Sequence, residues 1–140
     1  MKISKQDKVF LYDYLCEFEN EIKQHFGCYD FNDKKLQRFL FDHDIYIGAY
    51  NKTNRKKVIK HKYYLLFEQK KPKGKRNDVV HHLFRHVCNS VAHVHVIKSG
   101  RNKLRFDDFS MNDNKTMEGI IDQKVFQLLM EKLKSAKIKV

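Results

Sequence analysis

The sequence has few of the residues that usually interrupt regular secondary structure: it contains one proline and five glycines among 140 residues. This scarcity argues against a β-sandwich or barrel, whose many short strands need frequent turns. The composition therefore predicts long regular elements, mostly helices. Hydrophobic residues make up 41% of the chain and aromatic residues 13%, which is enough for a core and excludes wholesale disorder. We expect residues 1–140 to form a single domain.

Cysteines and long apolar runs are also scarce. Cys16, Cys28 and Cys88 are widely spaced and form no C-x-x-C pair, so the sequence predicts neither a zinc ribbon nor a redox motif. We interpret them as small core residues of a protein from a reducing compartment. No apolar run reaches the roughly 18–20 residues of a membrane span, and the first residues do not resemble a secretory signal. The prediction is a cytoplasmic protein without a membrane partner.

Positive charge exceeds negative charge by 12, and most of the excess lies in one segment. Residues 52–76, here called the basic segment, contain eleven Lys or Arg and a single acid, Glu68. Clustered cations beside aromatic residues are typical of proteins that neutralise nucleic-acid phosphates. A solubilising loop is the alternative interpretation. The residues predicted to bind RNA are Lys52, Arg55, Lys56, Lys57, Lys60, Lys62, Lys73, Lys75 and Arg76.

Hydrophobic periodicity predicts the elements along the chain. Apolar residues three and four positions apart indicate helices at about 5–26, 33–42, 78–95 and 121–136. The apolar run at 63–68 fits a helix or a strand, with a helix slightly favoured, and a short extended excursion is expected near 97–110. Four or five helices with short connectors predict an all-α fold, a four- to five-helix bundle.

The expected helix at 78–95 carries an unusual polar face. A helical wheel gathers these side chains on one side, opposite a face rich in valine and leucine: His82, Arg85, His86, Asn89 and His93. Three interpretations stay open. The polar groups pack against another helix or subunit, or His82 and His86 chelate zinc, or the face performs phosphodiester chemistry. In the last case His93 transfers a proton, Arg85 stabilises the phosphate charge and Asn89 positions the phosphate.

A metal centre is the least favoured of these interpretations. His93 lies too far along the helix axis to share an ion with His82 and His86, and no cysteine or carboxylate is placed nearby in the sequence. Asp107 and Asp108 are adjacent in an expected extended segment, so their side chains point to opposite faces and make a poor pair for two metals. We therefore predict no metal and no cofactor.

The stretch from Arg85 to His93 resembles the HEPN superfamily of small all-α domains. Many of these domains are metal-independent ribonucleases in toxin–antitoxin, abortive-infection and phage-defence systems, and their signature is an Arg, often followed by Asn, and a later His in a long helix. Asn89 and His93 match this signature, whereas Cys88 stands where the family has the Arg and Val94 where it often has Gly. The segment 106–120 looks like one defence-associated branch, and the similarity covers about residues 77–136.

The resemblance implies a homodimer in which the two motif helices face each other across the active site. It implies catalysis by His93, Asn89 and Arg85, with His82 and His86 as auxiliary groups. In this hypothesis a ribose 2′-hydroxyl attacks the adjacent phosphate, which restricts cleavage to RNA. The predicted function is a metal-independent endoribonuclease of toxin–antitoxin or phage-defence systems, with an antitoxin protein as a further partner. The alternatives are a catalytically silent module that binds RNA or protein, and a structural dimerisation module.

Overall fold

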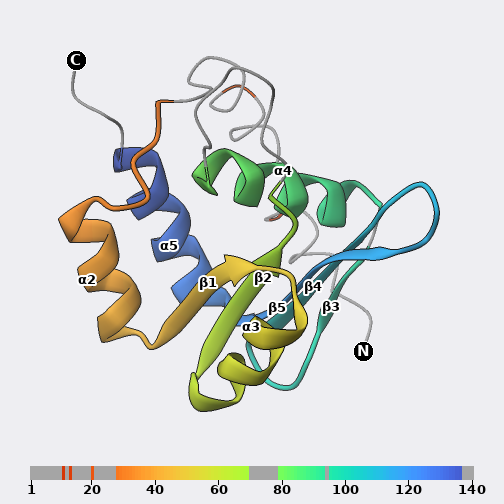
Figure 1. Cartoon of the computed structure of the whole chain (residues 1–140). Coiled ribbons are helices and arrows are strands. Elements are labelled where there is room, and N and C mark those ends of the chain that lie inside the picture. The colour runs from red at the N-terminus through yellow and green to blue at the C-terminus, as the bar shows by residue number, and fades with distance from the viewer. Residues whose placement is uncertain are drawn as a thin grey trace.

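The computed structural model describes residues 11, 13, 20, 28–69, 79–93 and 95–136, which form a mixed sheet and its covering helices (Figure 1). The sheet order is β1-β2-β5-β4-β3. Strands β1 and β2 run parallel, and all other neighbours are antiparallel. The elements in chain order are α2 (Lys34–Asp42), β1 (Ile45–Ala49), α3 (Lys52–Lys57), the 3-10 helix η1 (Val58–Lys60), β2 (Tyr63–Phe67), α4 (Val79–Ala92), β3 (Val96–Lys98), β4 (Lys103–Phe109), β5 (Lys115–Asp122) and α5 (Gln123–Ser135).

One face of the sheet carries the hydrophobic core. Alternate residues of β4, namely Leu104, Phe106 and Asp108, are buried on this face because successive side chains of a strand point to opposite sides. The ring of Phe106 packs 5.0 Å from that of Phe126 in α5. Helix α4 lies across the same face (Figure 1), where Ser90 donates a hydrogen bond to the Asp107 carbonyl oxygen at 2.7 Å. The core therefore sits between the sheet and α2, α4 and α5.

The opposite face is polar and carries α3. Arg105 of β4 donates to Asp107 at 3.1 Å and to Glu118 of β5 at 2.8 Å. Lys115 pairs with Asp107 at 3.1 Å, and Arg55 of α3 approaches Glu118 at 4.0 Å. The charges of this network lie beside one another on neighbouring strands, which stabilises the pairing of β4 and β5.

The sheet shows that the predicted all-α helical bundle and the HEPN resemblance are wrong. The run Tyr63–Phe67, for which a helix was slightly favoured, is β2. Leu65 and Leu66 point to opposite faces of the sheet, yet both are fully buried, because helices cover both faces there. A strand buried on both faces shows no alternation of apolar and polar residues, and periodicity does not separate it from a helix.

Asn and Asp take turn positions that glycine often fills, which explains why the low glycine count wrongly indicated helices. The hairpin between β3 and β4 uses Gly100 at φ 88° and Asn102 at φ 65°, and the hairpin between β4 and β5 uses Asp113 at φ 59°. Asn and Asp tolerate the left-handed region better than other residues with a Cβ atom. The chain therefore builds an antiparallel sheet with few glycines.

Several predicted elements are confirmed. Helix α2 begins after Asp33, whose side chain accepts a hydrogen bond from the Leu36 amide at 3.0 Å. The helix predicted at 78–95 is α4, the extended segment within 97–110 is β4, and the last helix is α5. Of the helix predicted at 5–26, only residues 11, 13 and 20 are described, all helical, and the rest lies outside the described residues. In the described part of the chain, no helix is both long and apolar enough to cross a membrane.

Gly119 of β5 is required by a close approach to β2. A Cβ atom there would lie 2.5 Å from Leu65 Cδ2 and 2.9 Å from the Tyr64 carbonyl oxygen. We expect Gly119→Ala to lower the free energy of unfolding by about 1–3 kcal/mol, because the overpacked strands must move apart. Urea denaturation followed by circular dichroism measures this. Lys103→Ala, at an exposed position of β4, is the control, and equal losses in the two variants would contradict the packing argument.

Candidate functional site

A polar cluster lies where α4 meets β4, and we name it the Asp108 cluster. Its members come from the C-terminal half of α4, the connection to β3, and β4: His86, Asn89, His93, His95 and Asp108. Helix α4 is held at this position by apolar residues on its sheet side, including Leu83 and Val87, both buried. Asp108 is the only acid among the described buried residues, with 2% of its surface exposed.

Hydrogen bonds hold the Asp108 carboxylate in its buried position. Its Oδ2 accepts from His86 Nδ1 at 2.8 Å and from Asn89 Nδ2 at 3.5 Å, and its Oδ1 accepts from the Phe109 amide at 2.9 Å. Burial alone would raise the pKa of Asp108, but the hydrogen bonds from His86 and from the Phe109 amide outweigh it and hold the pKa below its ordinary value of 3.8. Asp108 is therefore a carboxylate at neutral pH.

Both ring nitrogens of His86 face acceptors. Nδ1 meets the Asp108 carboxylate at 2.8 Å, and Nε2 meets the main-chain carbonyl oxygen of Glu68 at 3.0 Å. These contacts tie α4 to both β4 and the residue that follows β2. Arg85 lies alongside, with Nη2 3.4 Å from His86 Nε2.

His93 and His95 complete the cluster on its outer side. One ring nitrogen of each lies, together with a carboxylate oxygen of Asp108, in a group whose atoms are all within 4.8 Å of one another. His93 is exposed and His95 is half-buried. The ring of His95 packs edge-on against Phe109, with centroids 5.0 Å apart. Its Nδ1 is buried and makes no hydrogen bond to any described residue.

The structure brings together most of the residues predicted for catalysis. Asn89 and His93 lie at Asp108, Arg85 lies beside His86, and His86 itself is the principal partner of the carboxylate. His82 is buried on α4 one turn before His86 and does not belong to the group of three ligand atoms.

Two members of the cluster, Asp108 and His95, escaped the sequence analysis. The opposite orientation of Asp107 and Asp108 was predicted correctly, since Asp107 lies on the polar face and Asp108 faces the core. The sequence did not show that the core side of β4 faces α4, so that Asp108 meets His86 there. The alternation of Leu104, Phe106 and Asp108 was the available signal, because a carboxylate in line with two core residues needs a buried partner.

A second candidate site is the basic surface of α3 and η1, which we name the α3–η1 surface. All its basic side chains are exposed. Apart from the 4.0 Å approach of Arg55 to Glu118, none of them forms an ion pair with a described residue. The predicted RNA-binding residues Lys73, Lys75 and Arg76 lie outside the described residues. The members of the α3–η1 surface are Lys52, Arg55, Lys56, Lys57, Lys60 and Lys62.

Local hydrogen bonds fix the two ends of the α3–η1 surface. Asn51 caps α3 by accepting from the Asn54 amide at 2.8 Å, and Asn54 donates to the Ala49 carbonyl oxygen at 2.8 Å. At the far end Asp44 accepts from His61 Nδ1 at 2.7 Å and from the Lys62 amide at 2.9 Å. The cations therefore project from a segment tied to β1 at both ends.

The Asp44–His61 contact makes a contribution to the stability of the fold that depends on pH. The hydrogen bonds from His61 and from the Lys62 amide hold the pKa of the Asp44 carboxyl below its ordinary value of 3.8. Because the folded-state pKa is lowered, the stabilisation is complete above the unfolded-state pKa and is lost as the pH falls below about 3.8 through the folded-state pKa. An NMR titration of the Asp44 carboxyl carbon should show a midpoint below 3.8, and His61→Ala should raise it. His93→Ala is the control and should not move it. An unchanged midpoint in His61→Ala would show that His61 does not cause the shift.

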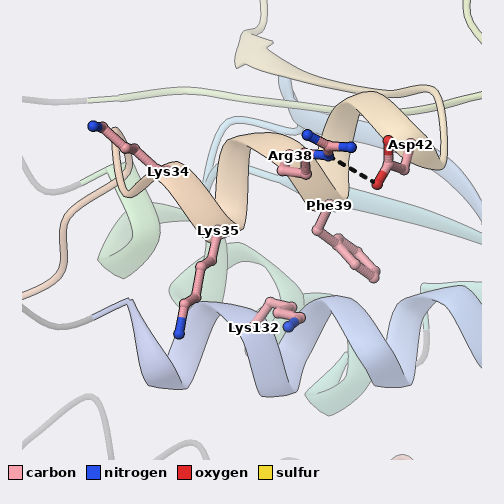
Figure 2. Close-up of a pocket in the computed structure, with 6 residues that line it drawn as sticks. All are labelled: Lys34, Lys35, Arg38, Phe39, Asp42 and Lys132. Atoms are coloured by element: carbon pink, nitrogen blue, oxygen red, sulfur yellow. Dashed lines mark ion pairs between the residues drawn. The ribbon is translucent and has the colours of Figure 1, made fainter.

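A further group of cations lines a hollow between α2 and α5 (Figure 2). The hollow has a volume of about 400 Å³, and Phe39 lies among its lining residues. Lys35 extends from α2 toward α5 (Figure 2), and Arg38 pairs with Asp42 at 3.6 Å. This basic group lies on the side of the sheet that α2, α4 and α5 cover, whereas the α3–η1 surface lies on the opposite side, with Glu118. Its basic members are Lys34, Lys35, Arg38 and Lys132.

Comparisons with protein-family models, with curated proteins and with solved structures gave no match to this chain. Function is therefore argued from the two sites themselves.

Proposed function

We propose that the protein binds single-stranded RNA through the α3–η1 surface. The observation that carries this proposal is the exposure of six basic side chains within eleven residues that contain no acid. Among the described residues, only Arg55 of these six lies within ion-pair distance of an acid, Glu118 at 4.0 Å. Such a surface suits the phosphate groups of a nucleic acid, because each contact between a cation and a phosphate releases counterions.

Aromatic side chains beside the cations favour a single strand. Tyr46 and Tyr50 are half-buried at the same edge of the sheet. The Arg55 guanidinium lies 5.7 Å from the centre of the Tyr50 ring, and the Tyr46 hydroxyl donates to Asn54 at 2.9 Å. Unpaired bases stack on such rings and on arginine, whereas bases within a duplex are not available for stacking. Helix α3, with six residues, is also shorter than the helices that read a DNA groove.

Fluorescence anisotropy with a short labelled RNA of mixed sequence tests the proposal. If all six cations contact phosphates, log Kd changes with log salt concentration with a slope of about 4, since each single-strand contact contributes about 0.7. Duplex RNA is expected to bind more weakly than the single strand. Absence of binding at low salt would contradict the proposal. Binding of single-stranded DNA but not of RNA would contradict the choice of RNA.

The other functional expectations stay predictions. Cleavage of RNA by Arg85, Asn89 and His93 is one of them, and a homodimer, an antitoxin partner and a cytoplasmic location are others. An assay in EDTA for RNA cleavage, with His93→Ala beside the wild type, tests the first. Cleavage by the wild type alone would make the Asp108 cluster an active site. Its absence in both proteins leaves the proposed function as RNA binding.

A further inference from the structure

Three metal-ligating side chains converge at the C-terminal end of α4. His93 follows the helix, His95 precedes β3 and Asp108 comes from β4, and one ligand atom from each lies within 4.8 Å of the other two. Two imidazoles and one carboxylate form a common ligand set for divalent transition metals. We propose that His93, His95 and Asp108 bind a divalent transition-metal ion of the zinc class. This inference does not depend on RNA binding.

The surroundings of Asp108 suit a metal-binding carboxylate. Its two oxygens offer about four acceptor positions, and three are used by His86, Asn89 and the Phe109 amide. One acceptor position, on Oδ1, therefore remains for an ion. Metal-binding side chains are commonly oriented by hydrogen bonds from residues that do not touch the ion. His86 and Asn89 would have this positioning role here.

His95 offers an independent reason to place an ion at the cluster. Its Nδ1 is buried and has no hydrogen-bond partner among the described residues. Buried polar atoms without partners are rare in native proteins, and a bound ion is one of the groups that can satisfy such an atom. Coordination through Nδ1 would supply the missing partner while the ring keeps its packing against Phe109.

The three ligand atoms lie farther apart than the ligands of a tetrahedral ion, and the exposed His93 side chain can move to shorten these distances. A tetrahedral ion with bonds of about 2.0–2.1 Å separates its ligand atoms by about 3.4 Å, so the three atoms, now within 4.8 Å, must close slightly. His93 is exposed and can rotate to do so, whereas Asp108 is held by its hydrogen bonds. Three protein ligands leave a coordination position for water.

Zinc titration of the chelator-treated protein tests the proposal. Isothermal titration calorimetry with zinc chloride should show one bound equivalent, and bound zinc should raise the melting temperature. His93→Ala should weaken zinc binding at least ten-fold with an unchanged circular dichroism spectrum, because its side chain is exposed. His61→Ala is the matched control: it removes a histidine from the other side of the sheet and should bind zinc like the wild type.

Two further measurements keep the test decisive. Cobalt(II) in place of zinc should give visible absorption bands that decrease in His93→Ala and in His95→Asn. Asp108→Asn should also weaken zinc binding, and the two histidine variants decide the matter if this variant does not fold. Absence of zinc binding by the wild type at about 100 µM ion, which corresponds to less than about 5.5 kcal/mol of affinity, would overturn the proposal. Equal affinity in the wild type, His93→Ala and His95→Asn would overturn it as well.

Discussion

Asp108→Ala is expected to lower the free energy of unfolding by about 1–3 kcal/mol, measured in EDTA by urea denaturation. The side chains of His86 and Asp108 are only 5% and 4% exposed. Removing the carboxylate leaves the buried His86 Nδ1 without its partner, while Nε2 keeps its contact with the Glu68 carbonyl oxygen. Breaking a buried pair by removing one partner is among the most destabilising single changes, because it leaves an uncompensated polar group.

A double-mutant cycle separates the His86–Asp108 hydrogen bond from general effects of truncation. If His86 and Asp108 stabilise each other, the double alanine variant should be more stable than the sum of the single losses predicts, by about 1–3 kcal/mol. Asp107→Ala is the matched control, because the neighbouring carboxylate lies on the polar face with Arg105 and Lys115. Its loss should be clearly smaller. Additive effects of His86→Ala and Asp108→Ala would contradict a stabilising contact between the two side chains.

Removing three cations from the α3–η1 surface is expected to weaken RNA binding about 10- to 100-fold at low salt. The variant is Lys56→Ala, Lys57→Ala and Lys60→Ala, three exposed positions without an ion pair among the described residues. Each lost contact with a phosphate contributes about 0.5–1 kcal/mol and about 0.7 to the salt slope. The slope should therefore fall by about 2.

The chain offers a control with the same change in net charge. Lys34→Ala, Lys35→Ala and Arg38→Ala remove three exposed cations from α2, beside the hollow on the helical side of the sheet (Figure 2). If RNA contacts the α3–η1 surface, this variant should bind with nearly the wild-type affinity and slope. Equal losses in the two triple variants would show that only the net charge matters.

The sequence predicted individual elements better than their assembly. Helices with a clear apolar stripe, such as Leu36, Phe39 and Leu40 of α2, were found with nearly correct ends. In α5, Leu128 is 52% exposed, whereas Phe126, Leu129, Met130 and Leu133 are fully buried. Apolar character alone therefore did not identify the buried face of this helix.

Local sequence patterns did not predict the sheet, for physical reasons that lie in β2, in β5 and in the turns. Strand β2 shows no alternation of apolar and polar residues, because Leu65 and Leu66 are both buried. Strand β5 contains Gly119, and a glycine inside an element usually indicates an interruption of regular structure. Asn102 and Asp113 make turns that glycine usually makes. Propensity and periodicity are local properties, whereas pairing of β2 with β5 joins residues fifty or more positions apart.

For the candidate sites too, the sequence predicted which residues of one helix lie together but not which partner another element supplies. The grouping of Arg85, His86, Asn89 and His93 on one helix face followed from the helical period alone, and these residues do lie together. Their carboxylate partner comes from β4, so its position depended on the fold. The absence of a nearby carboxylate in the sequence was one reason for predicting no metal. The position of Asp108 removes that reason.

Mapping the RNA contacts on the protein tests the central proposal most directly. Photo-cross-linking of a single-stranded RNA, followed by mass spectrometry of the attached peptides, identifies the residues in contact. We predict cross-links within residues 50–62, at Tyr50 and at the lysines of the α3–η1 surface. Cross-links confined to α2 and α5 around Lys35 and Lys132 would contradict the proposal, because that basic group lies on the other side of the sheet.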